Sequence, residues 1–210
     1  MQQAERETPI PISFEPATPT DAHLISTIDK EISKWEVSAS LKRGKVGNRV
    51  HARLFRPDTE TRTFEYLANH QARNTNYSFI ARRGDDAIGY MLVHTQTVQA
   101  GETMGHMLVS TQAAQEGQRV IDFAGWGVKP NQRSTSTAKA MLAKLFKIQE
   151  DLQLPIFAFA RIHLAEELAR NRWIVQQGYS AEIIKTGPLI SDGQPIKLTR
   201  IRPAVIPTQA

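Results

Sequence analysis

Apolar residues recur at helical spacing in two stretches near the start of the chain. The first follows a Thr/Asp segment that can cap a helix, and its apolar positions are Leu24, Ile25, Ile28 and Ile32. The second lies over 58–73, where Phe64, Leu67 and Ala68 support a helix. The pattern predicts a strand at 12–14 and a helix that together span 12–33, and then a second amphipathic helix.

The pattern then changes to short apolar runs. Residues 77–81 and 87–93 are two such runs around a Gly/Asp turn, which is typical of a β-hairpin. Residues 95–118 are mostly polar and contain three glycines, with one further short strand predicted at 107–109.

From Val120 onward, strands alternate with helices. The pattern predicts a strand over 120–128, a polar turn over 130–136 and a helix over 137–152. It continues with a strand over 154–160, a helix over 163–177 that Gly178 stops, and strands over 181–184 and 195–201. Hairpins followed by alternating elements predict an α+β class with a mixed sheet flanked by helices.

The chain length fits this pattern with one domain. The sequence has 210 residues, and we expect a single domain over 12–202 between flexible tails at 1–11 and 203–210. Neither a membrane-spanning apolar stretch nor a secretory leader is evident, so we expect a soluble, cytoplasmic protein that uses no membrane.

Cysteine is absent, which excludes disulfide scaffolds, thiolate metal sites and cysteine nucleophiles. The six histidines are scattered, and none belongs to an H-E-x-x-H pattern. We therefore expect no metal site.

The distribution of charged residues leaves the kind of partner open. The 26 basic and 21 acidic residues give a net charge of +5, which permits nucleic-acid binding but also fits an ordinary surface. Residues 38–56 form the most basic run, suited either to a groove for RNA or an acidic partner or to a solvated helix face. Several carboxylates could instead meet a cationic amine: Glu31, Glu36, Asp85, Asp86 and Glu102.

Small polar residues between a predicted strand and helix form the most informative segment, 128–138. A turn that enters a helix presents unpaired backbone N–H groups at the positive end of the helix dipole, an arrangement that suits a diphosphate. Serine and threonine hydroxyls can donate further hydrogen bonds there, and Arg133 can neutralise charge. The alternative is a plain capped helix start, because serine and threonine are favoured caps.

This segment resembles the central motif of the GCN5-related N-acetyltransferase (GNAT) superfamily, an Arg or Gln, two residues, a Gly, one residue, then a Gly or Ala. Arg133 opens the match, Ser136 stands in the first glycine place and Ala138 in the second. The predicted order of elements over most of 12–201 is similar to that of the family. Gly178 and Tyr179 are similar to its Gly-Phe pair.

The resemblance implies acetyl-CoA as co-substrate and no metal. Its diphosphate would lie against Arg133, Ser134, Thr135, Ser136, Thr137 and Ala138. Its pantetheine arm would pair with Trp126, Gly127 and Val128, on a strand splayed from residues 156–158. Glycines at 125 and 127 suit either close backbone approach or a bulge.

Catalytic residues follow from the same resemblance. Asp122 stands where histone-acetylating members carry a glutamate base, and a partly desolvated carboxylate there would have a raised pKa. The alternatives for Asp122 are an ion pair with an arginine or a place at the solvated end of the strand. Ile174 stands where many members have a tyrosine acid, which leaves Tyr179 as one candidate replacement, unless it serves only in packing.

We therefore expect an acetyl-CoA-dependent N-acyltransferase that acetylates a primary amine. The acceptor could be a small molecule, such as a polyamine, an aminoglycoside or lysine, or else a protein or an aminoacyl-tRNA. Two alternatives stay open, a degenerate member that binds CoA or a partner without transfer, and an RNA-directed acetyltransferase or RNA-binding protein. Dimers are common in the superfamily, so the resemblance includes a homodimer among the expected assemblies.

Overall fold

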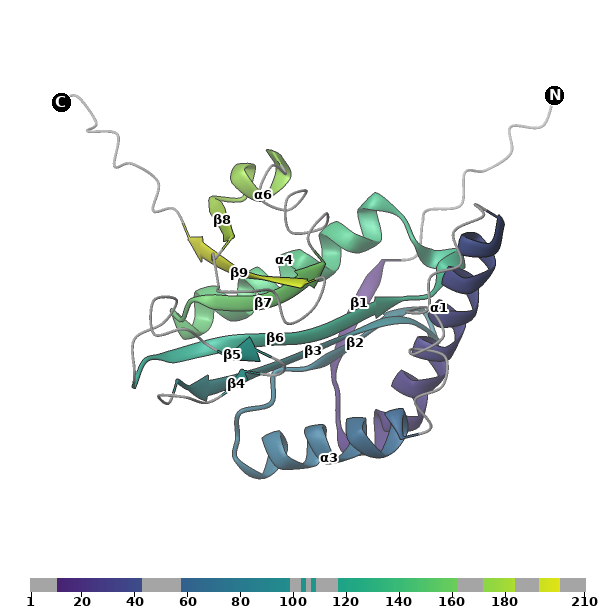
Figure 1. Ribbon diagram of the computed structural model, residues 1–210, viewed down its shortest axis with the longest axis horizontal. Coiled ribbons are helices and arrows are strands. Elements are labelled where there is room, and N and C mark those ends of the chain that lie inside the picture. The colour runs from purple at the N-terminus through teal and green to yellow at the C-terminus, as the bar shows by residue number, and fades with distance from the viewer. Residues whose placement is uncertain are drawn as a thin grey trace. The chain divides into compact units, whose positions relative to one another are not determined.

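The computed structural model describes residues 11–42, 58–98, 103–104, 107–108, 117–161, 172–183 and 193–200 (Figure 1). Its strands are β1 (Ile12–Pro16), β2 (Phe79–Arg83), β3 (Asp86–Thr97), β4 (Thr103–Met104), β5 (Met107–Leu108), β6 (Arg119–Val128), β7 (Ile156–Arg161), β8 (Tyr179–Ile183) and β9 (Gly193–Arg200). Its helices are α1 (Ala22–Lys42), α3 (Thr59–Ala72), α4 (Thr135–Leu152) and α6 (Arg172–Gln176), with short 3-10 turns η1 (Pro19–Asp21) and η2 (Pro130–Gln132).

The strands form a mixed sheet. Seven of them are hydrogen-bonded in the order β1-β2-β3-β6-β7-β9-β8, and β4 pairs separately with β5. The pair β6 and β7 is parallel, whereas β1 with β2, β2 with β3, β7 with β9 and β8 with β9 are antiparallel. The predicted α+β class with a mixed sheet is confirmed.

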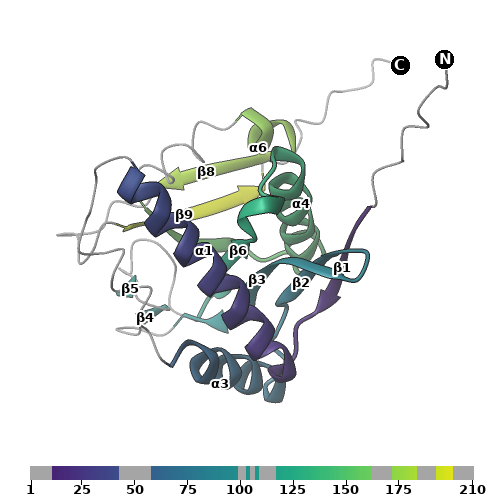
Figure 2. The ribbon, with the colours of Figure 1, turned by 90° about the vertical axis from the view of Figure 1, so that its right-hand side faces the viewer.

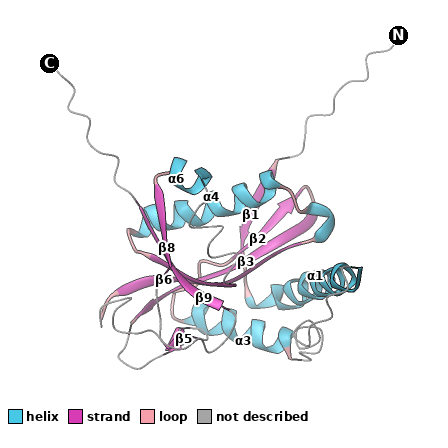
Figure 3. Cartoon of the chain, turned by 45° about the horizontal axis from the view of Figure 1, so that its top comes forward, coloured by secondary structure: helices cyan, strands magenta, loops and turns pink. Residues whose placement is uncertain are grey.

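The chain divides into two compact units, and β3 and β6 each run from one into the other. The first unit contains the chain up to Leu92 together with Gly125–Phe146. The second contains Val93–Ala124 and the chain from Lys147 onward. Figure 3 distinguishes helices, in cyan, from strands, in magenta.

In the first unit, α1 and α3 are packed together next to the strands β1, β2 and β3 (Figure 2). A capping contact starts this region: the Thr18 backbone N–H and hydroxyl both donate to Asp21 Oδ2, each at 2.8 Å, and the Asp21 N–H donates to the Thr18 carbonyl at 2.9 Å. Such a cap satisfies backbone groups that a helix start leaves unpaired.

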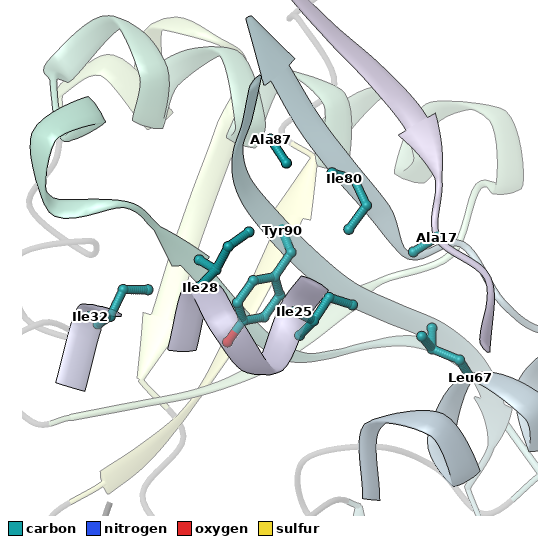
Figure 4. Packing of buried hydrophobic residues seen from close by; sticks show 8 residues of the cluster. All are labelled: Ala17, Ile25, Ile28, Ile32, Leu67, Ile80, Ala87 and Tyr90. Carbon is teal, nitrogen blue, oxygen red and sulfur yellow. The ribbon is translucent and has the colours of Figure 1, made fainter. Parts of the chain in front are cut away.

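The core of this unit is built from the apolar faces that the sequence pattern predicts. Its buried members are Ala17, Ile25, Ile28, Ile32, Leu67, Ile80, Ala87 and Tyr90. Figure 4 shows the Tyr90 ring between the side chains of Ile25 and Ile28. The Tyr90 hydroxyl donates to Asp29 Oδ1 at 2.8 Å, so the one polar atom of this aromatic core residue is satisfied.

The second unit has a sheet with two chemically different faces. One row of register partners is apolar and buried: Ile121, Ile156 and Leu198. The adjacent row, which alternation places on the other face, contains Asp122, Phe157, Lys197 and Glu182. One face therefore forms core, and the other carries ionisable groups.

Several boundaries differ from the predicted ones. Helix α1 continues to Lys42, past the predicted end at 33, and α4 begins at Thr135 instead of 137, because Ser134 caps the helix and leaves Thr135 and Ser136 in its first turn. The hairpin is confirmed, although β3 extends to Thr97. Gly178, with a φ of 81°, follows α6 as predicted.

Other predictions fall on residues that the structure does not describe. These include nearly all of both predicted tails, the basic run from residue 43 onward, Val109, and residues 163–171 of the predicted helix over 163–177.

Candidate functional site

The turn before α4 is lined by hydroxyl groups. Ser134 Oγ accepts the backbone N–H of Thr137 at 3.1 Å and lies 2.9 Å from both Ser136 Oγ and Thr137 Oγ1. Ser134 is thus the cap of the helix, while Thr137 is buried and Ser136 is exposed. The first-turn N–H groups of Thr135 and Ser136 have no carbonyl available within the helix, so they point out of its positive end. The arrangement offers hydroxyl and amide donors to an anion.

Arg133 precedes this turn in extended conformation, and its side chain lies on α1. Its Cζ stands 4.5 Å from the centre of the Trp35 ring, and its Nη2 is 3.8 Å from Glu36 Oε1. Its Nε donates to the Val128 carbonyl at 3.2 Å. The guanidinium is therefore held beside the last residue of β6 by an aromatic ring that is itself 45% exposed.

Gly127 lies where neighbouring side chains leave no room for a Cβ. A Cβ at this position would stand 2.6 Å from Tyr90 Cε1 and 2.7 Å from Ile32 Cδ1. At Gly125, by contrast, a Cβ would meet no atom within 4 Å. Packing by the Tyr90 and Ile32 side chains therefore accounts for a glycine at 127, whereas no neighbour requires one at 125. Close backbone approach by a ligand stays a prediction for both positions.

We expect Gly127→Ala to destabilise the fold by about 1 to 3 kcal/mol, since it overpacks a filled space. Gly125→Ala is the matched control and should change stability by no more than about 0.5 kcal/mol. Urea unfolding midpoints measure both effects. Equal midpoints for the two variants would contradict the close packing at Gly127.

Asp122 belongs to the second unit, in the part of β6 that pairs with β7. Asp122 is 6% exposed, and burial raises the pKa of its carboxyl group to about 6. Gln96 Nε2 donates to Asp122 Oδ2 at 3.4 Å, and His94 Nε2 stands 3.6 Å from the same oxygen. Neither alternative for Asp122 describes this geometry, because the carboxylate is buried and its ion-pair partner among the described residues is a histidine.

Ile174 and Tyr179 lie at the end of the second unit. Both residues are 1% exposed, which confirms the core position predicted for Ile174. Tyr179 opens β8, opposite Arg200 in the antiparallel register with β9. Tyr179 therefore directly follows Gly178, the glycine after the end of α6.

His94, Gln96 and Trp35 were not predicted from the sequence, and Glu36 was predicted only as a possible partner of a cationic amine, whereas the structure places it beside Arg133. A signal existed for the first two, because the polar run 94–97 ends an otherwise apolar strand. Trp35 and Glu36 fall on the part of α1 beyond its predicted end, where no pattern connects them with Arg133.

Within the described ranges, no group of three or more acidic, histidine or cysteine side chains could hold a metal ion. None of the helices described is both long and apolar enough to span a bilayer.

Comparison with known proteins supports the fold. No family model matches the chain, and no curated protein sequence matches it. Among solved structures, the PaiA N-acetyltransferase of Thermoplasma acidophilum, in complex with coenzyme A, superposes with a TM-score of 0.56 at 10% identity, covering 89% of this chain and 98% of its own. A GNAT-family acetyltransferase of Streptococcus agalactiae gives 0.56 at 11% identity, covering 91% and 95%.

NAA60 of Arabidopsis thaliana, in complex with acetyl-CoA, gives a TM-score of 0.51 at 15% identity and covers 91% of this chain and all of its own, 100%. At such identities the likeness is one of fold. The chain has the fold of the GCN5-related N-acetyltransferases.

Proposed function

We propose that the protein is an acetyl-CoA-dependent N-acyltransferase that acetylates a primary amine. The observation that carries the proposal is the hydroxyl-lined start of α4 directly after β6, in a fold whose solved examples include complexes with coenzyme A and acetyl-CoA. Acetyl-CoA supplies an activated acetyl group as a thioester.

The turn before α4 would hold the diphosphate. Ser134 and Ser136 present exposed hydroxyls, and the N–H groups of Thr135 and Ser136 stand at the positive end of an 18-residue helix. Ser134 Oγ makes three contacts inside the turn, one of which accepts the Thr137 N–H. A bound anion would compete with Ser134 Oγ for that N–H group. This donor set fits a diphosphate, with Arg133 and Ala138 completing the segment.

Residues Trp126, Gly127 and Val128 would pair with the pantetheine arm through their backbone groups. They form the last part of β6, beyond its parallel pairing with β7, which covers Ile121–Phe123. An amide-rich ligand can use main-chain groups of this kind as partners. The prediction that residues 156–158 lie across a gap from 126–128 is wrong, because residues 156–158 pair with 121–123.

Asp122 would act as the base. Attack on the thioester needs a neutral amine, so an ammonium acceptor must first release a proton. A carboxyl group with a pKa near 6 is ionised at neutral pH and is a better proton acceptor than a solvated carboxylate. Overall, a neutral amine and acetyl-CoA give an amide and the CoA thiol. The nitrogen loses one proton, and the sulfur gains one.

Tyr179 is the candidate donor of a proton, from its own hydroxyl, to the sulfur, and the proton held by Asp122 restores the balance. We expect Tyr179→Phe, which removes one oxygen, to lower kcat by about 10²-fold and to leave acetyl-CoA affinity unchanged. Tyr77→Phe is the matched control. A wild-type kcat in Tyr179→Phe would remove Tyr179 from the mechanism and leave water as the proton source.

The test of the proposal is a product assay with saturating acetyl-CoA and pooled polyamines, aminoglycosides, amino acids and peptides, read by mass spectrometry. The expected result is an acceptor that gains one acetyl group while free CoA appears in equal amount. Binding of acetyl-CoA with no product from any pool would favour a CoA-binding protein without transfer activity.

A further inference from the structure

His94 and Asp122 face each other across two strands of the second unit. Val98 N–H donates to the Gln118 carbonyl at 2.9 Å, and Gly117 N–H donates to the Val98 carbonyl at 2.9 Å. The two strands run antiparallel from the Val98–Gln118 bond. His94 lies four residues before Val98 and Asp122 lies four residues after Gln118, so the two residues stand opposite each other. The strand pairing itself thus fixes the two side chains on one face, with 3.6 Å between Nε2 and Oδ2.

Both partners are buried, His94 at 5% exposure and Asp122 at 6%. Two adjacent buried ionisable groups avoid a net charge when they hold one proton between them, because either extra charge would be poorly solvated. Gln96 restrains the arrangement, since its amide donates to the same carboxylate oxygen that faces His94.

Other charged groups lie further from the pair. On β7, the register partner of Asp122 is Phe157, and the partner of Phe157 on β9 is Lys197. The Lys197 Nζ stands 5.8 Å from the centre of the Phe157 ring, so this ring lies between the lysine and the carboxyl group. Glu182 on β8 is the next member of the row and is exposed, as is Arg119 at the start of β6. Because Lys197 is two strands away and Glu182 three, His94 is the ionisable group in direct reach of Asp122 among the described residues.

We propose that His94 is a positioning residue for Asp122, and that the single proton the pair comes to share is the one that Asp122 takes from the acceptor amine. This rests on the proposed function for its role in acyl transfer, but the sharing itself does not. The amine nitrogen loses a proton to Asp122, the N–C bond forms as the C–S bond breaks, and the sulfur finally takes a proton. His94 stabilises the carboxylate before transfer and the held proton after it.

The sharing is tested by NMR titration of the imidazole signals in the wild-type protein and in Asp122→Asn. In the wild type, the His94 signal should move in two steps, because coupled groups titrate as a pair. In Asp122→Asn it should move in one step whose midpoint lies at lower pH, since the neighbouring negative charge is gone.

A single His94 step in the wild type, or a midpoint that does not move in Asp122→Asn, would overturn the proposal. If Asp122→Asn does not fold, the wild type decides alone, because two steps support the sharing and one step contradicts it. These results do not depend on finding an acceptor, so they separate this inference from a failure of the proposed function.

Where acyl transfer is detected, His94→Gln should lower kcat/KM by about 10²-fold and shift the acidic limb of its pH profile, with acetyl-CoA affinity within about 3-fold of wild type. His23→Gln, the matched surface variant, should leave rate and profile unchanged. A loss of rate with an unmoved pH profile would assign His94 a structural role only.

Discussion

Replacing Asp122 by asparagine is expected to lower kcat/KM for acetyl transfer by about 10² to 10⁴-fold, while acetyl-CoA still binds. The reason is that the amide keeps the size of the side chain but cannot accept the amine proton. Cofactor binding should survive because the diphosphate donors belong to the turn at 133–138, outside the paired part of β6.

The same variant should also change how stability depends on pH. The carboxyl pKa rises on folding from 3.8 to about 6, so the folded protein holds this proton more tightly than the unfolded chain does. Stability from this group is complete below pH 3.8 and is lost as the pH rises through 6, at a total cost of about 3 kcal/mol. Relative to the wild type, Asp122→Asn should therefore gain about 2 to 3 kcal/mol between pH 4 and pH 8.

Urea unfolding at several pH values and steady-state kinetics measure the two effects together. Asp85→Asn, in an exposed turn, is the matched control and should show neither. A variant with wild-type kcat/KM would remove Asp122 as the base. A stability difference that stays constant from pH 4 to pH 8 would contradict the raised pKa.

Ser136→Glu is expected to weaken acetyl-CoA binding by about a thousand-fold without loss of the fold. Two unit charges about 4 Å apart repel by roughly 4 kcal/mol at an effective dielectric constant of about 20, which gives that factor. Ser136 is exposed and lies in the first turn of α4. A carboxylate there interacts favourably with the helix dipole and stabilises the fold by about 0.3 to 1 kcal/mol. Binding and stability should thus move in opposite directions.

Calorimetry with acetyl-CoA and thermal unfolding separate these two changes. Ala143→Glu adds the same charge on an exposed position further along α4 and should bind as the wild type does. Ser136→Gly restores the glycine of the motif and should bind at least as well. Wild-type affinity in Ser136→Glu would refute the diphosphate position.

Local patterning predicted most elements because each has a clear period. Helix α3 and strand β6 lie within one residue of their predicted ranges, and the apolar positions of α1 at Ile25, Ile28 and Ile32 form the core. The start of α4 was misplaced because serine and threonine serve equally as turn residues and as helix-start residues.

Contacts between distant segments could not be read from the sequence. The meeting of His94 with Asp122 depends on the register between β3 and β6, which a long connection separates. Likewise, Arg133 reaches Trp35 only because α1 runs beyond residue 33. The chemistry-bearing residue Asp122 was visible as a polar exception in an apolar strand, but its partner was not.

The most direct test of the account is titration calorimetry of the purified protein with acetyl-CoA and with CoA, accompanied by intact mass measurement to detect carried-over cofactor. The account predicts micromolar affinity for both ligands in the wild type and its loss in Ser136→Glu. No binding of either ligand to cofactor-free protein would mean that the hydroxyl-lined turn is only a helix cap, and would contradict the proposed function.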